Sequence, residues 1–380
     1  MQSILFISLM NSDPWGGSEV QWFSLAKYCL EKKISVSCLL YDWKEKKKYL
    51  EGLEKEGATI FFIPNKGRAK KDFLERLRFE WITRLQQKMF IKKFNFSTYD
   101  FVVVNQGGFM EVTNNPWKNV YTKLKSYCLT YHNYTLNFTF KPEKAKLLKA
   151  WIKNAHINIG DAERIKEVLE KQLEIEISNF KAIVNPLTIE KTNVFTNYPS
   201  LQNGNFKIIM LAQLDVSRKA QDNLIKVFAL PQWQNRNAIL EIYGDGEHYQ
   251  LLKNLIYQNN LSEKVFLKGN TKEVAKVIES SHLVLQITHR DAMPISVVEA
   301  MSKSRAVVVS NVGDMPLWVR NDFNGWVSPS ASELDIANVL EIAWSKKENW
   351  EQMGKNAFDT FTSKYPISVA EEFFTLISKT

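Results

Sequence analysis

Several familiar signatures are missing from this 380-residue chain, and each absence removes a class of protein. Only three cysteines occur, and the scattered positions of Cys29, Cys38 and Cys128 fit no disulfide framework, metal motif or redox motif. An odd and sparse count favours a reducing compartment. No apolar run approaches the ~20 residues that span a bilayer. The short apolar run from Ile4 to Met10 has no basic segment before it, so we read a buried strand there and expect a cytoplasmic protein without a signal peptide.

The sequence also contains no Walker A motif, no cluster with metal-ligand spacing and no G-x-S-x-G elbow. Tyr243-Gly-Asp-Gly246 is not a G-x-G-x-x-G fingerprint, so no nicotinamide cofactor is inferred. There is no short repeat or low-complexity block. Apolar residues make up 45% of the chain, enough for well-packed cores, and the length suggests two or three domains.

The charge is unbalanced, with a formal net charge of +9. Such a surplus suits nucleic acid, an anionic membrane surface or an anionic substrate. The segment Lys66–Lys93 holds ten Lys or Arg and three acids, and Phe73, Leu77, Trp81 and Leu85 recur there every four residues. One interpretation is a surface helix with a solvated basic face; the other is a helix that rests on anionic lipid headgroups. We expect no nucleic-acid partner, because no recognition module is present.

Short apolar runs alternate with amphipathic ones, which predicts parallel sheets covered by helices on both faces. Expected strands are Ser3–Ser8, Ser35–Leu40, Thr59–Ile63, Phe101–Val104, Tyr127–Tyr131, Ala155–Ile159 and Lys181–Val184, with helices at Glu19–Leu30 and Asp161–Gln172. After a polar segment, Asn197–Asn205, the pattern restarts. Expected strands are then Lys207–Leu211, Ile239–Tyr243, Val265–Lys268, Leu283–Ile287 and Ala306–Ser310. Helices are expected at Gln221–Ala229, His248–Gln258, Val274–Glu279, Ser296–Lys303 and Ser368–Ser378. Two doubly wound domains follow, and ligands of such sheets bind at the carboxyl ends of the strands.

The most informative stretch follows the expected strand Leu283–Ile287 and reads D-A-M-P-I-S-V-V-E from Asp291 to Glu299. Loop and helix amides there can face phosphates, and the two carboxylates can accept hydrogen bonds from sugar hydroxyls. The same residues fit a capping box, with Ser296 as N-cap and Glu299 reaching back to its amide. Both interpretations stay open at this point.

Other loops after expected strands carry candidate groups. Gly16 and Gly17 precede a helix, where backbone can approach an anion, or they form a plain turn capped by Ser18 and Gln21. Arg218 and Lys219 are either ligands of an anionic leaving group or solvated cations.

His132 follows the strand Tyr127–Tyr131. It is placed either to contact a sugar hydroxyl or to pack among aromatic residues. The sequence offers it no evident acid–base partner.

In order and spacing, these pieces resemble the retaining GT-B glycosyltransferases of family 4, the glycosyl transferases group 1. The resemblance covers nearly the whole chain. It runs from Gly16-Gly17-Ser-Glu and His132 through Val184-Asn185-Pro-Leu, Gln213 to Asp222, and Tyr243-Gly-Asp-Gly246. It ends with Asp291 to Met301, Ser310-Asn-Val-Gly313 and Asn324-Gly325. It implies an α/β GT-B architecture, two doubly wound Rossmann-like domains that face a central cleft.

The resemblance also implies roles for individual residues. Glu299 matches the acid that holds the nucleotide ribose, and Asp291 takes the place of the acid that contacts the transferred sugar. Amides around Ile295 and Ser296 are expected at the diphosphate. Lys219 matches the phosphate-binding lysine. Gly17 at the diphosphate and His132 near the donor sugar are assigned in the same way. Arg218 is expected at the diphosphate as a substitute for the cation that Gln213 lacks.

Some positions depart from the family pattern. Asp291 replaces the usual Glu, Ala292 the usual Gly, and Gln213 the usual phosphate-binding Arg, while Gly313-Asp-Met-Pro-Leu317 lacks the terminal acid. These departures motivate an alternative, a catalytically degenerate protein that still binds nucleotide sugar or serves as a scaffold.

The expected function is retaining sugar transfer from a nucleotide-diphosphate sugar, a UDP-sugar above all, to a hydroxyl of a glycan or lipid-linked acceptor in bacterial cell-surface polysaccharide synthesis. No metal and no cofactor beyond this co-substrate are expected. The expected location is cytoplasmic, peripheral on the inner face of the plasma membrane. The expected domains are 1–196 together with a returning helix at 366–380, which bind the acceptor, and 205–365, which bind the donor.

Overall fold

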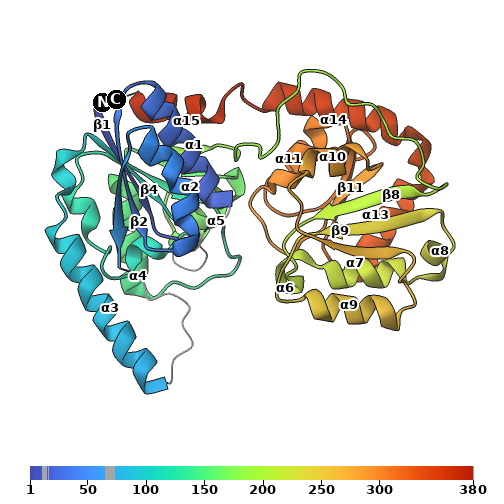
Figure 1. Cartoon of the computed structure of the whole chain (residues 1–380), viewed down its shortest axis with the longest axis horizontal. Helices are drawn as coiled ribbons and strands as arrows, with labels where there is room; N and C mark the ends of the chain where they lie inside the picture. The colour runs from blue at the N-terminus through green and yellow to red at the C-terminus, as the bar shows by residue number, and fades with distance from the viewer. Residues whose placement is uncertain (11–14, 16, 65–72, 380) are drawn as a thin grey trace. The chain divides into compact units, whose positions relative to one another are not determined.

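The computed structural model of the chain describes residues 1–10, 15, 17–64 and 73–379. The chain divides into two compact units, Met1–Pro186 with Ile367–Thr380, and Leu187–Pro366. Each unit is an α/β sandwich around a parallel sheet (Figure 1). None of the described helices is long and apolar enough to cross a bilayer.

The first unit is built on a seven-stranded parallel sheet in the order β3-β2-β1-β4-β5-β6-β7. Its strands are β1 (Ser3–Ser8), β2 (Ser35–Tyr41), β3 (Thr59–Ile63), β4 (Phe101–Asn105), β5 (Tyr127–Tyr131), β6 (Ile157–Gly160) and β7 (Phe180–Ala182). Its α-helices are α1 (Gly17–Glu31), α2 (Lys44–Lys55), α3 (Phe73–Lys93), α4 (Pro142–Asn154), α5 (Glu163–Leu173) and α15 (Val369–Ser378). Three short 3₁₀ turns are η1 (Phe96–Thr98), η2 (Glu111–Thr113) and η3 (Val120–Lys123).

The second unit repeats the plan with six strands in the order β10-β9-β8-β11-β12-β13. They are β8 (Phe206–Leu211), β9 (Ala238–Tyr243), β10 (Val265–Gly269), β11 (Leu283–Gln286), β12 (Ala306–Ser310) and β13 (Gly325–Ser328). The longer helices are α7 (Gln221–Phe228), α9 (Tyr249–Gln258), α10 (Val274–Glu279), α11 (Ile295–Ser302), α13 (Glu333–Ser345) and α14 (Trp350–Lys364). Short turns are α6 (Val216–Lys219), α8 (Pro231–Gln234), α12 (Met315–Trp318) and η4 (Lys347–Asn349).

The central strands are buried along their whole length, as β4, β5 and β12 show. Continuous burial is what a parallel sheet covered on both faces requires, and it explains why these strands read as apolar runs. In both units the strand order reverses beside the first strand, between β1 and β4 and between β8 and β11. This reversal creates a crevice at the carboxyl ends of the strands, where ligands of such sheets bind.

Two expectations about the domains need correction. The first unit ends at Pro186, so residues 187–196 belong to the second unit and not to the first. They are held there because Thr188 bonds to Glu299 and the Thr196 amide donates to Ser304 Oγ. The polar segment Asn197–Asn205 is therefore a surface connection within the second unit. At the other end of the chain, residues 367–380 belong to the first unit, in which α15 packs against α1 (Figure 1).

Candidate functional site

In the second unit, two charged side chains meet at the point where the strand order reverses. Lys219 ends the short turn after β8, and Asp291 lies in the loop after β11, the strand next to β8. The Lys219 ammonium donates to Asp291 Oδ2. The Lys219 side chain is buried, whereas the Asp291 side chain is 20% exposed. A cation and a carboxylate are thus fixed side by side at the ligand-binding edge.

Helix α11 begins without a side-chain cap. Its N-cap is Pro294, and Ser296 lies inside the first turn, where its hydroxyl donates to Gln286 Oε1 at 3.0 Å. Glu299 does not reach back to the Ser296 amide. The capping-box interpretation is therefore wrong, because Pro294 fixes the helix start two residues earlier than that motif requires. The amides of Ile295 and Ser296 belong to the first turn of the helix, where amides have no intrahelical acceptor.

Glu299 is held from outside its own helix. The amide and hydroxyl of Thr188 donate to Glu299 Oε1 at 2.8 and 2.6 Å. Glu299 is buried to 2% exposure, and burial raises the pKa of this carboxyl above its usual value, while the two bonds from Thr188 act in the opposite direction. The second oxygen, Oε2, has no hydrogen-bond partner among the described residues. One carboxylate oxygen is thus anchored and the other is available.

Arg218 provides a cation next to Gln213. Arg218 Nη2 donates to Gln213 Oε1 at 2.7 Å, and its Nε lies 3.7 Å from Asp215. The Arg218 guanidinium is therefore hydrogen-bonded to the Gln213 side chain. Gln213 replaces the arginine of the family pattern, but a positive charge is still present at this position because Arg218 lies next to Gln213.

Close backbone packing shapes the loops around these groups. Gly313 has φ +57°, and a Cβ there would stand 1.7 Å from the Ala292 carbonyl oxygen. The Asp314 amide donates to that same oxygen at 3.0 Å. The loop carrying Asp291 is thus supported by residues 313–314, and only glycine permits this approach.

A pocket of about 410 Å³ opens at the carboxyl ends of β8, β9 and β10. Leu211, Tyr243 and Val274 line its wall together with polar groups of Gln213 and Asn270. Its volume lies in the range of about 300–1,000 Å³ that small-ligand sites occupy. The glycines of the Tyr243-Gly-Asp-Gly246 loop allow its backbone to pack directly against residues 212–214.

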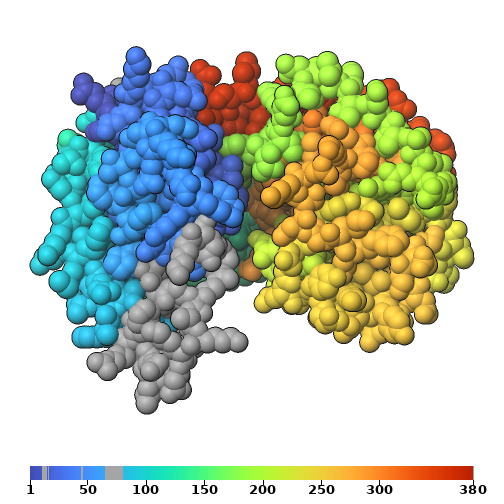
Figure 2. Space-filling view, viewed as in Figure 1, coloured from blue at the N-terminus to red at the C-terminus, as the bar shows by residue number. Residues whose placement is uncertain are grey.

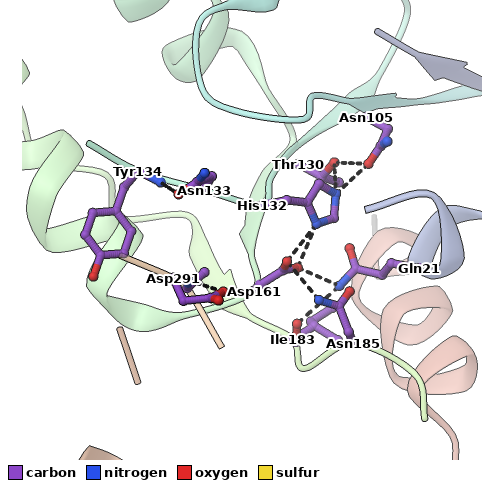
Figure 3. Close-up of polar contacts among 11 residues, drawn as sticks. Gln21, Asn105, Thr130, His132, Asn133, Tyr134, Asp161, Ile183, Asn185 and Asp291 are labelled. Carbon is purple, nitrogen blue, oxygen red and sulfur yellow. Dashed lines mark hydrogen bonds and ion pairs between the residues drawn. The ribbon is translucent and has the colours of Figure 1, made fainter. Parts of the chain in front are cut away.

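In the first unit, His132 lies beside a buried carboxylate (Figure 3). The two oxygens of Asp161 lie 2.9 and 2.8 Å from His132 Nδ1, so Nδ1 carries a proton and donates. On the opposite side of the ring, Nε2 lies 2.6 Å from Asn105 Oδ1, and Thr130 Oγ1 donates to that same oxygen at 2.9 Å. His132 is therefore an oriented polar group and not a histidine packed among aromatic residues.

Asp161 is the residue that sequence reasoning missed. It was expected to open a helix, but α5 begins at Glu163 and Asp161 follows directly after β6. Gln21 and Asn185 also donate to its carboxylate, at 3.2 and 2.9 Å (Figure 3). A polar residue directly after a buried strand was the signal that could have found it, since the ends of β5 and β6 are neighbours.

Gly17 is the first residue of α1 and is exposed; Gly16 lies outside the described residues. Gln21 does not cap this helix, because its side chain donates to Asp161 and to the Ile183 carbonyl. The next residue after Ser18, Glu19, is fully buried and lies 3.3 Å from Lys46, which is fully buried as well. It also accepts from Ser8 Oγ at 2.5 Å.

Helix α3 lies on the surface, and both its basic side chains and several of its apolar side chains are exposed. Trp81, Leu85 and Met89 are 67%, 44% and 51% exposed, whereas Thr83 and Gln87 are buried. The expected solvated basic face is therefore present in residues 80–93, whereas Trp81 and Leu85 do not face the core. Residues 65–72 of the basic segment lie outside the described part of the chain.

One group of side chains has metal-ligand spacing among the described residues. Ligand atoms of Asp215, Glu247 and His248 lie within 4.8 Å of one another. Asp215 already accepts from Ser217 Oγ at 2.6 Å and lies beside Arg218. We assign no ion to this exposed group.

The second unit is similar to a known protein family. Residues 197–360 match the family described as glycosyl transferases group 1. The matched residues lie entirely within the second unit, Leu187–Pro366. Within it lie Lys219, Asp291 and Glu299, the three side chains at the ligand-binding edge.

Curated relatives match over part of their length. Poly(ribitol-phosphate) alpha-N-acetylglucosaminyltransferase of Staphylococcus aureus (strain COL) is 25% identical over 203 residues, 52% of this chain and 41% of the relative. UDP-Gal:alpha-D-GlcNAc-diphosphoundecaprenol alpha-1,3-galactosyltransferase of Escherichia coli is 23% identical over 176 residues, 43% of this chain and 44% of the relative. The chain thus spans less than half the length of the curated relatives it matches here.

The whole chain is similar to solved structures. Alr3699/HepE of Anabaena, crystallised in complex with UDP, has a TM-score of 0.74 and 16% identity, with 100% of both chains covered. This likeness establishes the fold, two Rossmann-like parallel sheets as in GT-B proteins, which confirms the predicted fold class.

Proposed function

We propose that this protein is a retaining glycosyltransferase that moves a sugar from a UDP-sugar to a hydroxyl of a glycan or lipid-linked acceptor in cell-surface polysaccharide synthesis. The observation that carries the proposal is the contact between Lys219 and Asp291 at the switch point of the second sheet. It places the Lys219 ammonium, which can bind the diphosphate, next to the Asp291 carboxylate, which can accept hydrogen bonds from sugar hydroxyls. The names of the two curated relatives, both sugar transferases, support the same reaction class.

In this proposal the donor lies along the edge of the second unit. The free Oε2 of Glu299 accepts from a ribose hydroxyl, and the pocket near Gln213 and Asn270 takes the base. Lys219, Arg218 and the first amides of α11 face the diphosphate. UDP is the favoured nucleotide, because UDP is named for the E. coli relative and is bound by the Anabaena structure.

The transfer step then needs no dedicated base. The bond between the anomeric carbon and the β-phosphate oxygen breaks, and the acceptor oxygen bonds to the same face of that carbon. The acceptor's proton passes to the departing phosphate oxygen, so UDP and the glycoside are the products. Lys219 stabilises the charge that develops on the diphosphate, which is the role for which preorganised cations are most effective. His132, oriented by Asp161, is the polar side chain that the first unit is proposed to contribute to the reaction.

Turnover separates this proposal from the degenerate alternative. Purified full-length protein is incubated with UDP-, GDP- and ADP-sugars and lipid-linked acceptors, and the anomeric configuration of the product is determined by NMR. We expect a UDP-sugar to be turned over with its configuration retained, and Glu299→Ala to lose nucleotide affinity. Tight UDP binding without turnover would favour the degenerate protein. Absence of both binding and turnover would exclude both.

The outward stripe of α3 supports a peripheral membrane location as well. Trp81, Leu85 and Met89 are exposed on one face, and Lys92 and Lys93 follow at the end of the helix. Exposed aromatic and aliphatic residues beside cations suit an anionic membrane interface. Cosedimentation with vesicles of phosphatidylglycerol, compared with phosphatidylcholine, tests it. Binding to the anionic vesicles that is lost in Leu85→Glu supports the location; equal binding by Leu85→Glu contradicts it.

A further inference from the structure

The first unit has two adjoining pockets of different character. The smaller, about 210 Å³, is lined by Leu9, Tyr41 and Trp117 together with the carboxylates of Glu80 and Glu111. It lies where β1 and β2 end, because Leu9 follows β1 and Tyr41 closes β2. This edge contains the switch point between β1 and β4, where ligands of doubly wound sheets bind.

The larger pocket, about 570 Å³, lies beside it and is cationic. Arg84 and Lys88 face it from α3, and Lys144 faces it from α4. Trp81 and Leu85 supply apolar surface on the same side. Figure 2 shows α3, in cyan, on the surface of the first unit.

The cations are poorly neutralised. Lys144 donates to the Thr113 carbonyl and to Asn114 Oδ1, both at 2.7 Å, and neither acceptor carries a charge. Arg84 lies 3.7 Å from Glu80 with 78% of its side chain exposed, so that pairing is weak. Lys88 has no ion-pair partner among the described residues. The pocket therefore presents a surplus of positive charge.

The two pockets share Arg84, Asn114 and Asn115, so one ligand can span them. Carboxylates and aromatic rings in the first suit sugar hydroxyls and ring faces. The cations in the second suit a phosphate group, with apolar surface for a carbon chain next to it. The order of chemistry along the groove is therefore hydroxyl-rich, then anionic, then apolar.

We propose that this groove gives the protein selectivity for acceptors that carry a phosphoester next to the accepting sugar, with Lys88 and Lys144 as the phosphate-binding residues. The proposal rests on the proposed function, since it names the acceptor class of that reaction. Its ligand-binding part is independent of the donor site, because every residue involved lies in the first unit.

The test uses the full-length protein and a matched pair of probes, octyl-linked N-acetylglucosaminyl diphosphate and octyl N-acetylglucosaminide. Binding is followed by tryptophan fluorescence, which Trp81 and Trp117 in the groove report. We expect the diphosphate probe to bind at least about tenfold more tightly than the glycoside, and Lys88→Gln and Lys144→Gln each to remove about five- to tenfold of its affinity. Lys153→Gln, which removes an exposed cation of α4 outside the groove, is the control and should change nothing.

Several outcomes overturn the proposal. Equal binding of the two probes, or full affinity in both groove variants, would show that the groove does not select phosphate. Groove variants that still bind the diphosphate probe but no longer bind anionic vesicles would show that the cations contact a membrane surface instead. Lys144→Arg, which keeps the charge, should retain affinity and so separates a charge effect from a local folding effect. UDP titrated in parallel should bind all variants equally; a protein that binds the probe but never UDP contradicts the proposed function and not the groove.

Discussion

Thr188 donates two hydrogen bonds to a single oxygen of Glu299, at 2.8 Å from its amide and 2.6 Å from its hydroxyl. The two residues are 111 positions apart in the sequence. Both bonds go to Oε1, so the carboxylate is anchored in one orientation and its other oxygen is left for a ligand. Thr188 therefore acts as a positioning residue for the carboxylate that we assign to the nucleotide ribose.

This arrangement predicts a measurable contribution of the Thr188 hydroxyl to nucleotide affinity. Thr188→Val keeps the hydrogen bond from the backbone amide and the side-chain shape, but it removes the hydroxyl donor. We expect the Kd for UDP to rise about fivefold, which corresponds to the net free energy of one hydrogen bond. Isothermal titration calorimetry measures it. Thr192→Val in the same segment is the control, because the Thr192 hydroxyl bonds to the Val194 carbonyl and not to Glu299. Tighter UDP binding by Thr188→Val would mean that Thr188 blocks the site.

A pH dependence follows from the buried state of Glu299. Burial raises its pKa above the usual value of 4.5. Ionised Glu299 is the better acceptor for a ribose hydroxyl, so bound UDP favours the charged form and affinity falls as the pH is lowered through the raised pKa. Calorimetry between pH 4.5 and 8 should show a loss of affinity on the acid side that Glu299→Gln lacks. The same loss in Glu299→Gln would assign the titration to another group.

The pairing of His132 with Asp161 predicts a catalytic defect without a donor-binding defect. Asp161→Asn removes the charged acceptor of the Nδ1–H bond, and the loss of a charge-assisted bond of about 1.5–3 kcal/mol corresponds to a fall in kcat of about ten- to a hundredfold. The UDP Kd should not change, because the UDP site is proposed in the second unit. If Asp161→Asn lowers the melting temperature but leaves kcat unchanged, Asp161 has only a structural role.

The buried pair of Glu19 and Lys46 predicts a large stability effect. Both side chains are fully buried, and burial lowers the pKa of Lys46 while the neighbouring carboxylate raises it. Glu19→Gln leaves that ammonium without a charge partner and should cost about 3–5 kcal/mol in the free energy of unfolding. Urea denaturation measures it, with Glu351→Gln as the control, since the exposed Glu351–Lys355 pair is worth about 0.3–0.5 kcal/mol. Equal costs for the two variants would contradict the assigned role of burial.

The sheets could be predicted because the central strands of parallel sheets are buried on both faces and read as apolar runs. For the same reason the loops at their carboxyl ends, which carry Lys219, His132 and Asp291, were placed correctly. Strand β13 was not predicted: it has only four residues, Gly325–Ser328, and it begins with glycine and ends with serine, which are typical of loops. Short edge strands carry too little periodic signal to be recognised alone.

The partners of the site residues could not be predicted, because they are distant in sequence. Asp161 meets His132 across neighbouring strands, and Thr188 meets Glu299 only once the second unit has folded. The direction of α3 was equally hidden. A four-residue apolar period fits a stripe that faces inward or outward, and only the structure shows that Trp81 is exposed whereas Thr83 and Gln87 are buried.

Single-turnover kinetics with a UDP-sugar tests whether Lys219 and Asp291 form the core of a sugar-transfer site. Lys219→Met should lower the rate about a hundred- to a thousandfold, the usual effect of removing one preorganised group that stabilises the transition state. Lys207→Met, which removes a buried cation paired with Glu241 elsewhere in the same unit, provides the comparison and should leave far more activity in the folded fraction. We expect the rate to collapse in Lys219→Met while UDP still binds; an unchanged rate in that variant would contradict a role of Lys219 in sugar transfer.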